Sequence, residues 1–209
     1  WKVLCGSKEV KQTQKGEYTQ YEFGASDQMS TYLFSFVAGK FESVTQKPAN
    51  MEMTMLYREK DTTKIKYSLD SIFNLYQQSL SFLEKYTAYP FPFQKMDFAA
   101  IPGFQYGGME HVGAIQYREN SLFLDESATA NNKLSRAKLI AHETSHMWFG
   151  DLVTMNWFND VWMKEVFANF MADKIMNPAF PDIDHQLAFM ITHYPNAYSE
   201  DRTLGTNPI

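Results

Sequence analysis

The chain has 209 residues, of which 44% are hydrophobic and 16% aromatic, so it can form one large domain with a substantial core, or one and a half smaller ones. Its formal net charge is −5, and no basic stretch interleaves with aromatic residues, which argues against a nucleic-acid partner. No apolar run reaches the roughly eighteen residues of a transmembrane segment, and the single cysteine, Cys5, excludes an internal disulfide framework.

Short segments of alternating hydrophobicity predict strands in the first part of the chain. Residues 18–23 and 31–38 are rich in β-branched and aromatic side chains and are followed by glycines. Residues 51–57 alternate in the same way. The polar residues 59–64 then predict a turn.

The hydrophobic period changes after this turn. Apolar side chains recur at helical spacing from Ile72 to Tyr86, and Pro90 and Pro92 stop the pattern, which predicts a helix. We expect its aromatic stripe to pack in the core and not to form a binding surface. Residues 96–101 predict a further strand.

Two glycines introduce the next part of the chain. Residues 105–115 are punctuated by glycines and then become strand-like, and Gly107 and Gly108 would let a ligand approach the backbone closely. Residues 133–149 have the pattern of a helix, which Gly150 can end.

Another helix is predicted after Asn159 or Asp160, either of which can cap it. It runs to about Met176, where an Asn-Pro pair ends it. Residues 184–193 predict a further helix, whereas residues 201–209 show no regular pattern.

The segment His142-Glu143-Thr144-Ser145-His146 has a spacing that favours a metal site. On a helix its two histidines lie one turn apart, about 6 Å along the axis and about 40° around it, so both imidazoles can reach one ion. Glu143 points close to the same edge, where it can hold a water molecule bound to that ion. Glu165, on the following helix, is the candidate third ligand of a catalytic zinc site with an open fourth position.

The alternative is a surface helix with two solvated histidines, because a His-Glu-x-x-His pattern also arises by chance. Residues 139–141 and 147–149, which flank the motif, are apolar and indicate a helix that is buried on most sides. Buried histidines need partners, so we favour the zinc site.

With these segments in order, the sequence resembles the aminopeptidase N family of zinc peptidases (gluzincins), which includes the leukotriene hydrolase. Gly107-Gly108-Met109-Glu110-His111 resembles the family's exopeptidase signature Gly-x-Met-Glu-Asn, and residues 116–119 resemble the stretch after it. Residues 142–154 (HETSHMWFGDLVT) and 157–168 (WFNDVWMKEVFA) resemble the family's metal-site helices. Residues 29–33 resemble the end of its N-terminal β domain, so the resemblance covers essentially the whole chain.

The resemblance implies an α+β fold, with a thermolysin-like zinc peptidase catalytic domain preceded by the last strands of an N-terminal β domain. We expect residues 1–45 to belong to the β domain and residues 46–209 to a catalytic domain truncated on its C-terminal side. The family's oxyanion-stabilising tyrosine would lie beyond Ile209, so we expect the chain alone to be weakly active or inactive. A leader could likewise lie before Trp1, which leaves open whether the protein is cytoplasmic or exported.

The resemblance also implies roles for individual residues. His142, His146 and Glu165 would bind one Zn²⁺. Glu143 would be the catalytic general base, which takes a proton from metal-activated water and passes it toward the leaving amine. Glu110 would bind the free α-ammonium of the substrate, a contact that converts a peptidase into an aminopeptidase.

The neighbours of Glu110 are expected to contact the substrate as well. The N–H groups near Gly107 and Gly108 would hold the substrate backbone, and Met109 would line the specificity pocket. His111 stands where the family usually has Asn, so it would either substitute as a hydrogen-bonding group or alter the amine pocket. Asp173 is a candidate to orient a histidine, although the family's carboxylate falls one residue earlier.

These features predict a zinc-dependent aminopeptidase that acts on peptides with a free N-terminus. The alternatives are a zinc endopeptidase, an epoxide-hydrolase-like relative, and a non-catalytic scaffold stabilised by zinc. Glu143 argues against a scaffold, because a structural site needs no general base and normally closes all four ligand positions. The preferred N-terminal residue and the oligomeric state are left open.

Overall fold

The computed structural model describes residues 1–48 and 51–203. The chain divides into two units, Trp1–Met176 and Asn177–Ile209. The first unit combines strands and helices, which confirms the predicted α+β class.

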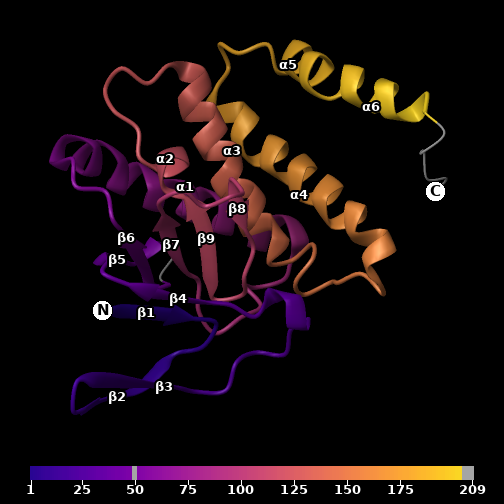
Figure 1. The fold of residues 1–209 in the computed structure, drawn as a ribbon. Coiled ribbons are helices and arrows are strands. Elements are labelled where there is room, and N and C mark those ends of the chain that lie inside the picture. The colour runs from indigo at the N-terminus through magenta and orange to yellow at the C-terminus, as the bar shows by residue number, and fades with distance from the viewer. Residues whose placement is uncertain (49–50, 204–209) are drawn as a thin grey trace. The chain divides into compact units, whose positions relative to one another are not determined.

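A five-stranded mixed sheet forms the centre of the first unit (Figure 1). In spatial order its strands are β5 (Glu42–Gln46), β6 (Met53–Tyr57), β7 (Asp97–Ile101), β9 (Ala114–Arg118) and β8 (Gly108–Met109). β6, β7 and β9 run parallel, whereas β5 and β8 at the two edges are antiparallel to their neighbours. β8 is therefore paired with β9 on one side only within this sheet.

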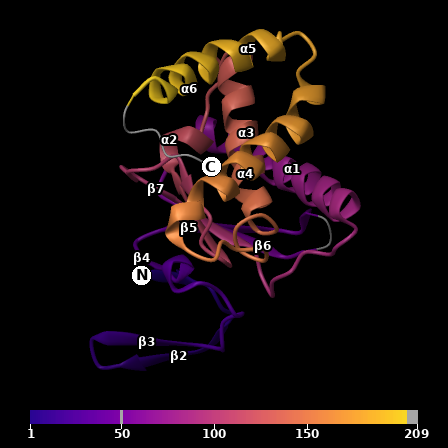
Figure 2. The same cartoon turned by 90° about the vertical axis from the view of Figure 1, so that its right-hand side faces the viewer.

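Two antiparallel pairs precede the sheet. β1 (Lys2–Cys5) pairs with β4 (Phe36–Gly39), and β2 (Glu9–Lys15) pairs with β3 (Tyr18–Phe23). In Figures 1 and 2 the β2–β3 hairpin extends away from the central sheet. The strand expected over residues 31–38 is only partly right, because Thr31–Leu33 forms a 3-10 turn that brings Leu33 into the core before β4 begins.

Three long helices and one short helix complete the first unit. They are α1 (Thr62–Thr87), α2 (Glu119–Leu122), α3 (Ala130–His146) and α4 (Val161–Met176). α3 packs against both α1 and α4. No helix in the described part of the chain combines the length and hydropathy needed to cross a membrane.

The aromatic stripe of α1 joins this helix to the sheet. The rings of Phe73 and Tyr76 lie 5.6 and 4.6 Å from the ring of Phe98 on β7, measured between centroids. The hydroxyl of Tyr76 donates to that of Tyr117 on β9 at 2.7 Å. This packing confirms that the stripe belongs to the core, with the exception of Tyr86, which is about half exposed.

Capping residues explain where the helices begin. α1 starts inside the polar stretch expected to be a turn, because the Asp61 carboxylate accepts hydrogen bonds from the N–H groups of Thr63 and Lys64. α3 starts three residues earlier than predicted, since Thr129 and Asn132 form a capping box. It ends at His146, ahead of the predicted stop at Gly150.

α4 has the predicted C-terminal end, Met176. Asn159 and Asp160, the predicted caps, lie in a 3-10 turn, Phe158–Asp160, directly before the helix. The helix predicted over residues 133–149 is thus present with shifted ends, and the helix predicted after Asn159 or Asp160 begins at Val161.

In its described part, residues 177–203, the second unit contains two helices beyond a 3-10 turn at Asn177–Ala179. α5 (His185–Thr192) matches the predicted helix, and the Asp184 side chain caps it by accepting from the N–H of Leu187. α6 (Tyr194–Asp201) was not predicted, because it lacks an apolar stripe of helical period. Of the tail predicted to be irregular, residues 204–209 lie outside the described residues.

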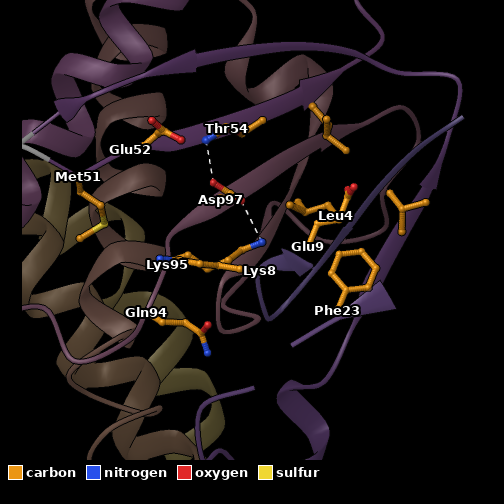
Figure 3. A pocket seen from close by; sticks show the side chains of 12 residues that line it. Leu4, Lys8, Glu9, Phe23, Met51, Glu52, Thr54, Gln94, Lys95 and Asp97 are labelled. Carbon is orange, nitrogen blue, oxygen red and sulfur yellow. Dashed lines mark hydrogen bonds and ion pairs between the residues drawn. The ribbon is translucent and has the colours of Figure 1, made fainter. Parts of the chain in front are cut away.

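A cavity of about 420 Å³ is lined by residues of the N-terminal strands β1, β2 and β3 and of the sheet strands β6 and β7 (Figure 3). The buried ammonium of Lys95 lies 2.9 Å from the Asp97 carboxylate and donates to the Ser7 carbonyl at 3.3 Å. Asp97 in turn accepts from the N–H of Thr54 at 2.7 Å. The hydrogen bond from Lys95 to the Ser7 carbonyl therefore links the N-terminal segment to the sheet, and Asp97 balances the charge of Lys95.

Candidate metal centre

The last turn of α3 and the second turn of α4 bring three ligand-type side chains together. The Nε2 atoms of His142 and His146 lie 3.0 Å apart. One carboxylate oxygen of Glu165, Oε2, lies 3.3 Å from Nε2 of His142 and 3.6 Å from Nε2 of His146. The structure therefore places the predicted third ligand beside both histidines, across the packed pair α3 and α4.

The donor atoms of this cluster suit a divalent cation. The three atoms lie within 4.8 Å of one another, and two imidazole nitrogens with one carboxylate oxygen are a usual donor set for catalytic zinc. Nδ1 of His146 lies 3.1 Å from the carbonyl oxygen of Phe149. Nδ1–H donates to that carbonyl, so the lone pair is on Nε2 and faces the cluster.

Hydrogen bonds and charge keep the Glu165 carboxylate ionised. Burial raises its pKa, but the contacts with His142, His146 and the ammonium of Lys164 outweigh burial, so that the pKa lies far below its ordinary value. The ionised carboxylate is the form in which Glu165 can bind a metal.

Glu143 lies beside the cluster and is 3% exposed. Its Oε2 atom has no hydrogen-bond partner among the described residues, and its carboxylate packs against the backbone of β8 at Gly108. Burial, and then the nearby Glu110 and Glu165 carboxylates, raise its pKa well above the ordinary value. One oxygen of Glu143 also lies within 4.8 Å of ligand atoms of Glu110 and His146.

Glu110 follows β8 directly and is also 3% exposed. Its carboxylate accepts a short hydrogen bond from the ammonium of Lys164. Burial raises its pKa, but the proximity of His146 and the hydrogen bond from Lys164 outweigh burial and lower the pKa below the ordinary value. The predicted amine-binding carboxylate is thus ionised, buried and close to the metal cluster.

The remaining residues of the predicted signature lie around β8. Gly108 and Met109 form this edge strand, and the carbonyl of Gly107 accepts from the N–H of Arg118 at 2.9 Å. His111 points elsewhere, because its Nδ1–H donates to the carbonyl of Leu33 at 3.0 Å. Burial lowers the pKa of His111 below its usual value, although this hydrogen bond acts in the opposite direction.

Asp173, considered as an orienter of a histidine, pairs with Lys138 of α3 at 2.6 Å. This contact makes it part of an ion pair between α3 and α4. Nδ1 of His142 is buried and has no hydrogen-bond partner among the described residues. Of the two histidines, only His146 therefore has its tautomer fixed by a described protein group.

Sequence reasoning missed two charged residues of this region. Lys164 is 9% exposed, and its ammonium contacts both Glu110 and, at 2.8 Å, Oε1 of Glu165. Asp151 is 5% exposed, and neither of its carboxylate oxygens has a partner among the described residues. Burial, followed by the charge of Glu110, raises the pKa of Asp151 well above its ordinary value.

A signal for Lys164 was available, since it directly precedes the third ligand, but a lysine on a helix is ordinarily solvated. Only the packing of α4 against α3, and the contact with Glu110 after β8, show that its ammonium is buried between carboxylates. The same holds for Asp151, which follows a glycine and would ordinarily be assigned to an exposed turn.

Comparison with known proteins gives the same family as the motifs. Residues 71–209 match the family model described as Peptidase family M1 domain. The whole chain is 33% identical to "Probable aminopeptidase 1" of Sulfurisphaera tokodaii and to "Leucyl aminopeptidase" of Saccharolobus solfataricus, and covers 26% of each. Over 77% of its length it is 40% identical to "Endoplasmic reticulum aminopeptidase 1" of Homo sapiens, of which it covers 17%.

The chain thus spans about a quarter of the length of the two archaeal relatives. The matches confirm the resemblance to the aminopeptidase N family stated from the sequence. Together with the cluster of His142, His146 and Glu165, the family match over residues 71–209 supports one assignment. This chain belongs to peptidase family M1, a family of metallopeptidases.

Proposed function

We propose that this chain forms the zinc-binding part of an aminopeptidase that removes N-terminal residues from peptides. The observation that carries the proposal is the convergence of two imidazole nitrogens and one carboxylate oxygen beside the buried, unpartnered Oε2 of Glu143. A structural metal site would have no use for that carboxylate. The names of the relatives, which are aminopeptidases, support the same reaction.

In this proposal His142, His146 and Glu165 hold one Zn²⁺. When bound, the metal acts as a Lewis acid and lowers the pKa of acidic groups near it. Glu143 takes up at Oε2 a proton from the water molecule that attacks the peptide carbonyl, and returns it to the amine that leaves when the peptide bond breaks. Its burial suits this task, because a general base works best when its pKa lies near the pH of operation.

Glu110 binds the α-ammonium of the substrate, and its depressed pKa keeps it ionised for this purpose. The edge strand β8 supports a role for Gly107, Gly108 and Met109, since one side of an edge strand can pair with an extended peptide. His111 acts indirectly, because its hydrogen bond to the carbonyl of Leu33 holds the chain that follows β8 in place.

The proposed architecture is thermolysin-like, with residues 1–45 as the end of a β domain and residues 46–209 as part of the catalytic domain. The parallel order of β6, β7 and β9 with α1 packed on this sheet, and the position of the metal cluster on α3 and α4, support it. The activity belongs to the full-length protein, because the chain covers about a quarter of its archaeal relatives.

The test compares Glu143→Gln and Glu110→Ala with the unchanged full-length protein, by zinc analysis and by release of aminoacyl-anilides. Glu143→Gln should keep zinc and lose turnover, whereas a scaffold would show no turnover to lose. Glu110→Ala should lose most activity on free-amine substrates. An endopeptidase or an epoxide-hydrolase-like relative would scarcely respond to Glu110→Ala on its own substrate.

A further inference from the structure

The ammonium of Lys164 occupies a site built from groups that bind cations. It contacts the carboxylate of Glu110 and lies 2.8 Å from Oε1 of Glu165. The face of the Tyr32 ring is 5.6 Å away, measured from Nζ to the ring centroid. Two carboxylates and an aromatic face are what a protein uses to bind an ammonium ion.

The backbone is shaped around the stem of this lysine. Gly150 has a φ of 140°, and a Cβ atom on it would lie 3.3 Å from Cδ of Lys164 and 3.1 Å from Nδ1 of His146. The loop after α3 can therefore lie directly against both side chains. Lys164 is 9% exposed as a result, and its ammonium lies inside the site.

The position of this ammonium matters because Glu110 is the carboxylate to which we assign the α-ammonium of the substrate. One carboxylate would then serve two ammonium groups, one internal and one from the substrate. Lys164 also lines an apolar cavity of about 420 Å³ next to the site, and Asp160 lines the same cavity. If Lys164 is displaced from Glu110, its side chain can enter this cavity and approach the carboxylate of Asp160.

We infer that Lys164 is a specificity-determining residue whose ammonium occupies the amine site of Glu110 until the α-ammonium of a substrate displaces it. The inference rests on the proposed role of Glu110. Lys164 lowers the affinity of the site for free amines, because each substrate must replace an ion pair that already exists.

The direction of the effect follows from charge balance. With Lys164 replaced by a neutral side chain, Glu110 would be buried without its cation, a state that is unfavourable. The arriving α-ammonium would then have no competing ammonium at Glu110 and would bind more strongly. Lys164→Arg keeps the positive charge and is the matched control.

The experiment uses the zinc-loaded full-length protein at pH 7 and measures calorimetric dissociation constants for leucinol and its des-amino counterpart, 4-methylpentan-1-ol. Neither compound has a scissile bond, so the readout does not depend on turnover. The ratio of the two constants reports how much the α-ammonium contributes to binding. We expect a ratio below about tenfold in the unchanged protein, less than an unopposed hydrogen bond between charged groups gives.

Lys164→Gln should raise this ratio by about tenfold or more and lower the KM for aminoacyl-anilides with a smaller change in kcat. Lys164→Arg should leave the ratio near that of the unchanged protein. An unchanged or lower ratio in Lys164→Gln, with or without loss of zinc, would overturn the inference and make Lys164 a positioning residue for Glu165. If Lys164→Gln does not fold, a ratio of about tenfold or more in the unchanged protein overturns it.

Failure of the proposed function looks different. It would appear as no release of N-terminal residues by the unchanged full-length protein, whatever the binding ratio. The two results are therefore separable in one set of preparations.

Discussion

Gly108 and Glu143 are packed so closely that a Cβ atom on Gly108 would lie 2.2 Å from Oε1 of Glu143. Gly108 belongs to the edge strand β8, and Glu143 to the last turns of α3. The absence of a side chain at residue 108 is therefore what allows the sheet edge and the proposed general base to share one site.

Gly108→Ala should displace the Glu143 carboxylate and lower kcat/KM about a hundredfold, since a shift of about 1 Å in a catalytic group has that order of effect. Zinc content should stay unchanged, because the three nearest heavy atoms that such a Cβ would meet all belong to Glu143 and not to a metal ligand. The control is Gly107→Ala, whose Cβ would meet only Cδ1 of Leu139, at an ordinary 3.4 Å. Equal activity of the two variants would contradict this prediction.

Asp173→Ala should change the free energy of unfolding by less than about 1 kcal/mol, because its pair with Lys138 is partly exposed to solvent. Zinc affinity should not change if Asp173 acts as a link between α3 and α4. Denaturant unfolding and a zinc-competition titration measure the two quantities. A tenfold loss of zinc affinity would instead assign Asp173 to the support of a metal ligand.

Asp151→Asn should stabilise the metal-free protein increasingly as the pH rises. The folded state raises the pKa of Asp151 well above its ordinary value, so the folded protein retains a proton that the unfolded chain releases above about pH 4. The unchanged protein therefore loses stability as the pH rises from this value to the pKa of Asp151 in the folded state. The variant does not lose it, because Asn does not titrate. The difference in Tm between variant and unchanged protein should grow between pH 4.5 and 8; a constant difference would refute the assignment.

Ala88→Gly should stabilise the fold by up to about 1 kcal/mol. Ala88 ends α1 with a φ of 53°, a left-handed conformation that glycine adopts without the steric cost of a Cβ. Ala137→Gly, in the interior of α3, is the opposite control and should destabilise by about 1 kcal/mol or more. Denaturant unfolding of both variants checks the prediction, and destabilisation by Ala88→Gly would contradict it.

Local signals in the sequence located most of the fold. The alternation of residues 18–23 and the apolar period after Ile72 each correspond to an element of the predicted type. The starts of α1 and α3 were missed because side-chain caps at Asp61 and Thr129 outweigh the polar character of the residues after them. α6 has no apolar stripe, so no periodic signal was there to find.

The metal-binding side chains of the candidate site could be predicted from the sequence, because the residue types and their spacing indicate a metal site. Two histidines four residues apart can reach one ion if the segment is helical. Glu165 can join them if its own helix packs against the first. The environment of Lys164 could not be read from the sequence, because it depends on β8, α4 and the loop at Gly150 meeting at one point. The contact of His111 with Leu33 could not be predicted either, because it joins segments far apart in the sequence that no local pattern relates.

His142 and His146 belong to the last five residues of α3, so the metal cluster lies near the C-terminal end of that helix. The aligned peptide dipoles give this end about half a negative charge. The backbone itself therefore attracts a cation, independently of which side chains supply the donor atoms. A variant that loses one ligand but retains the helix end should still concentrate divalent ions weakly at this point.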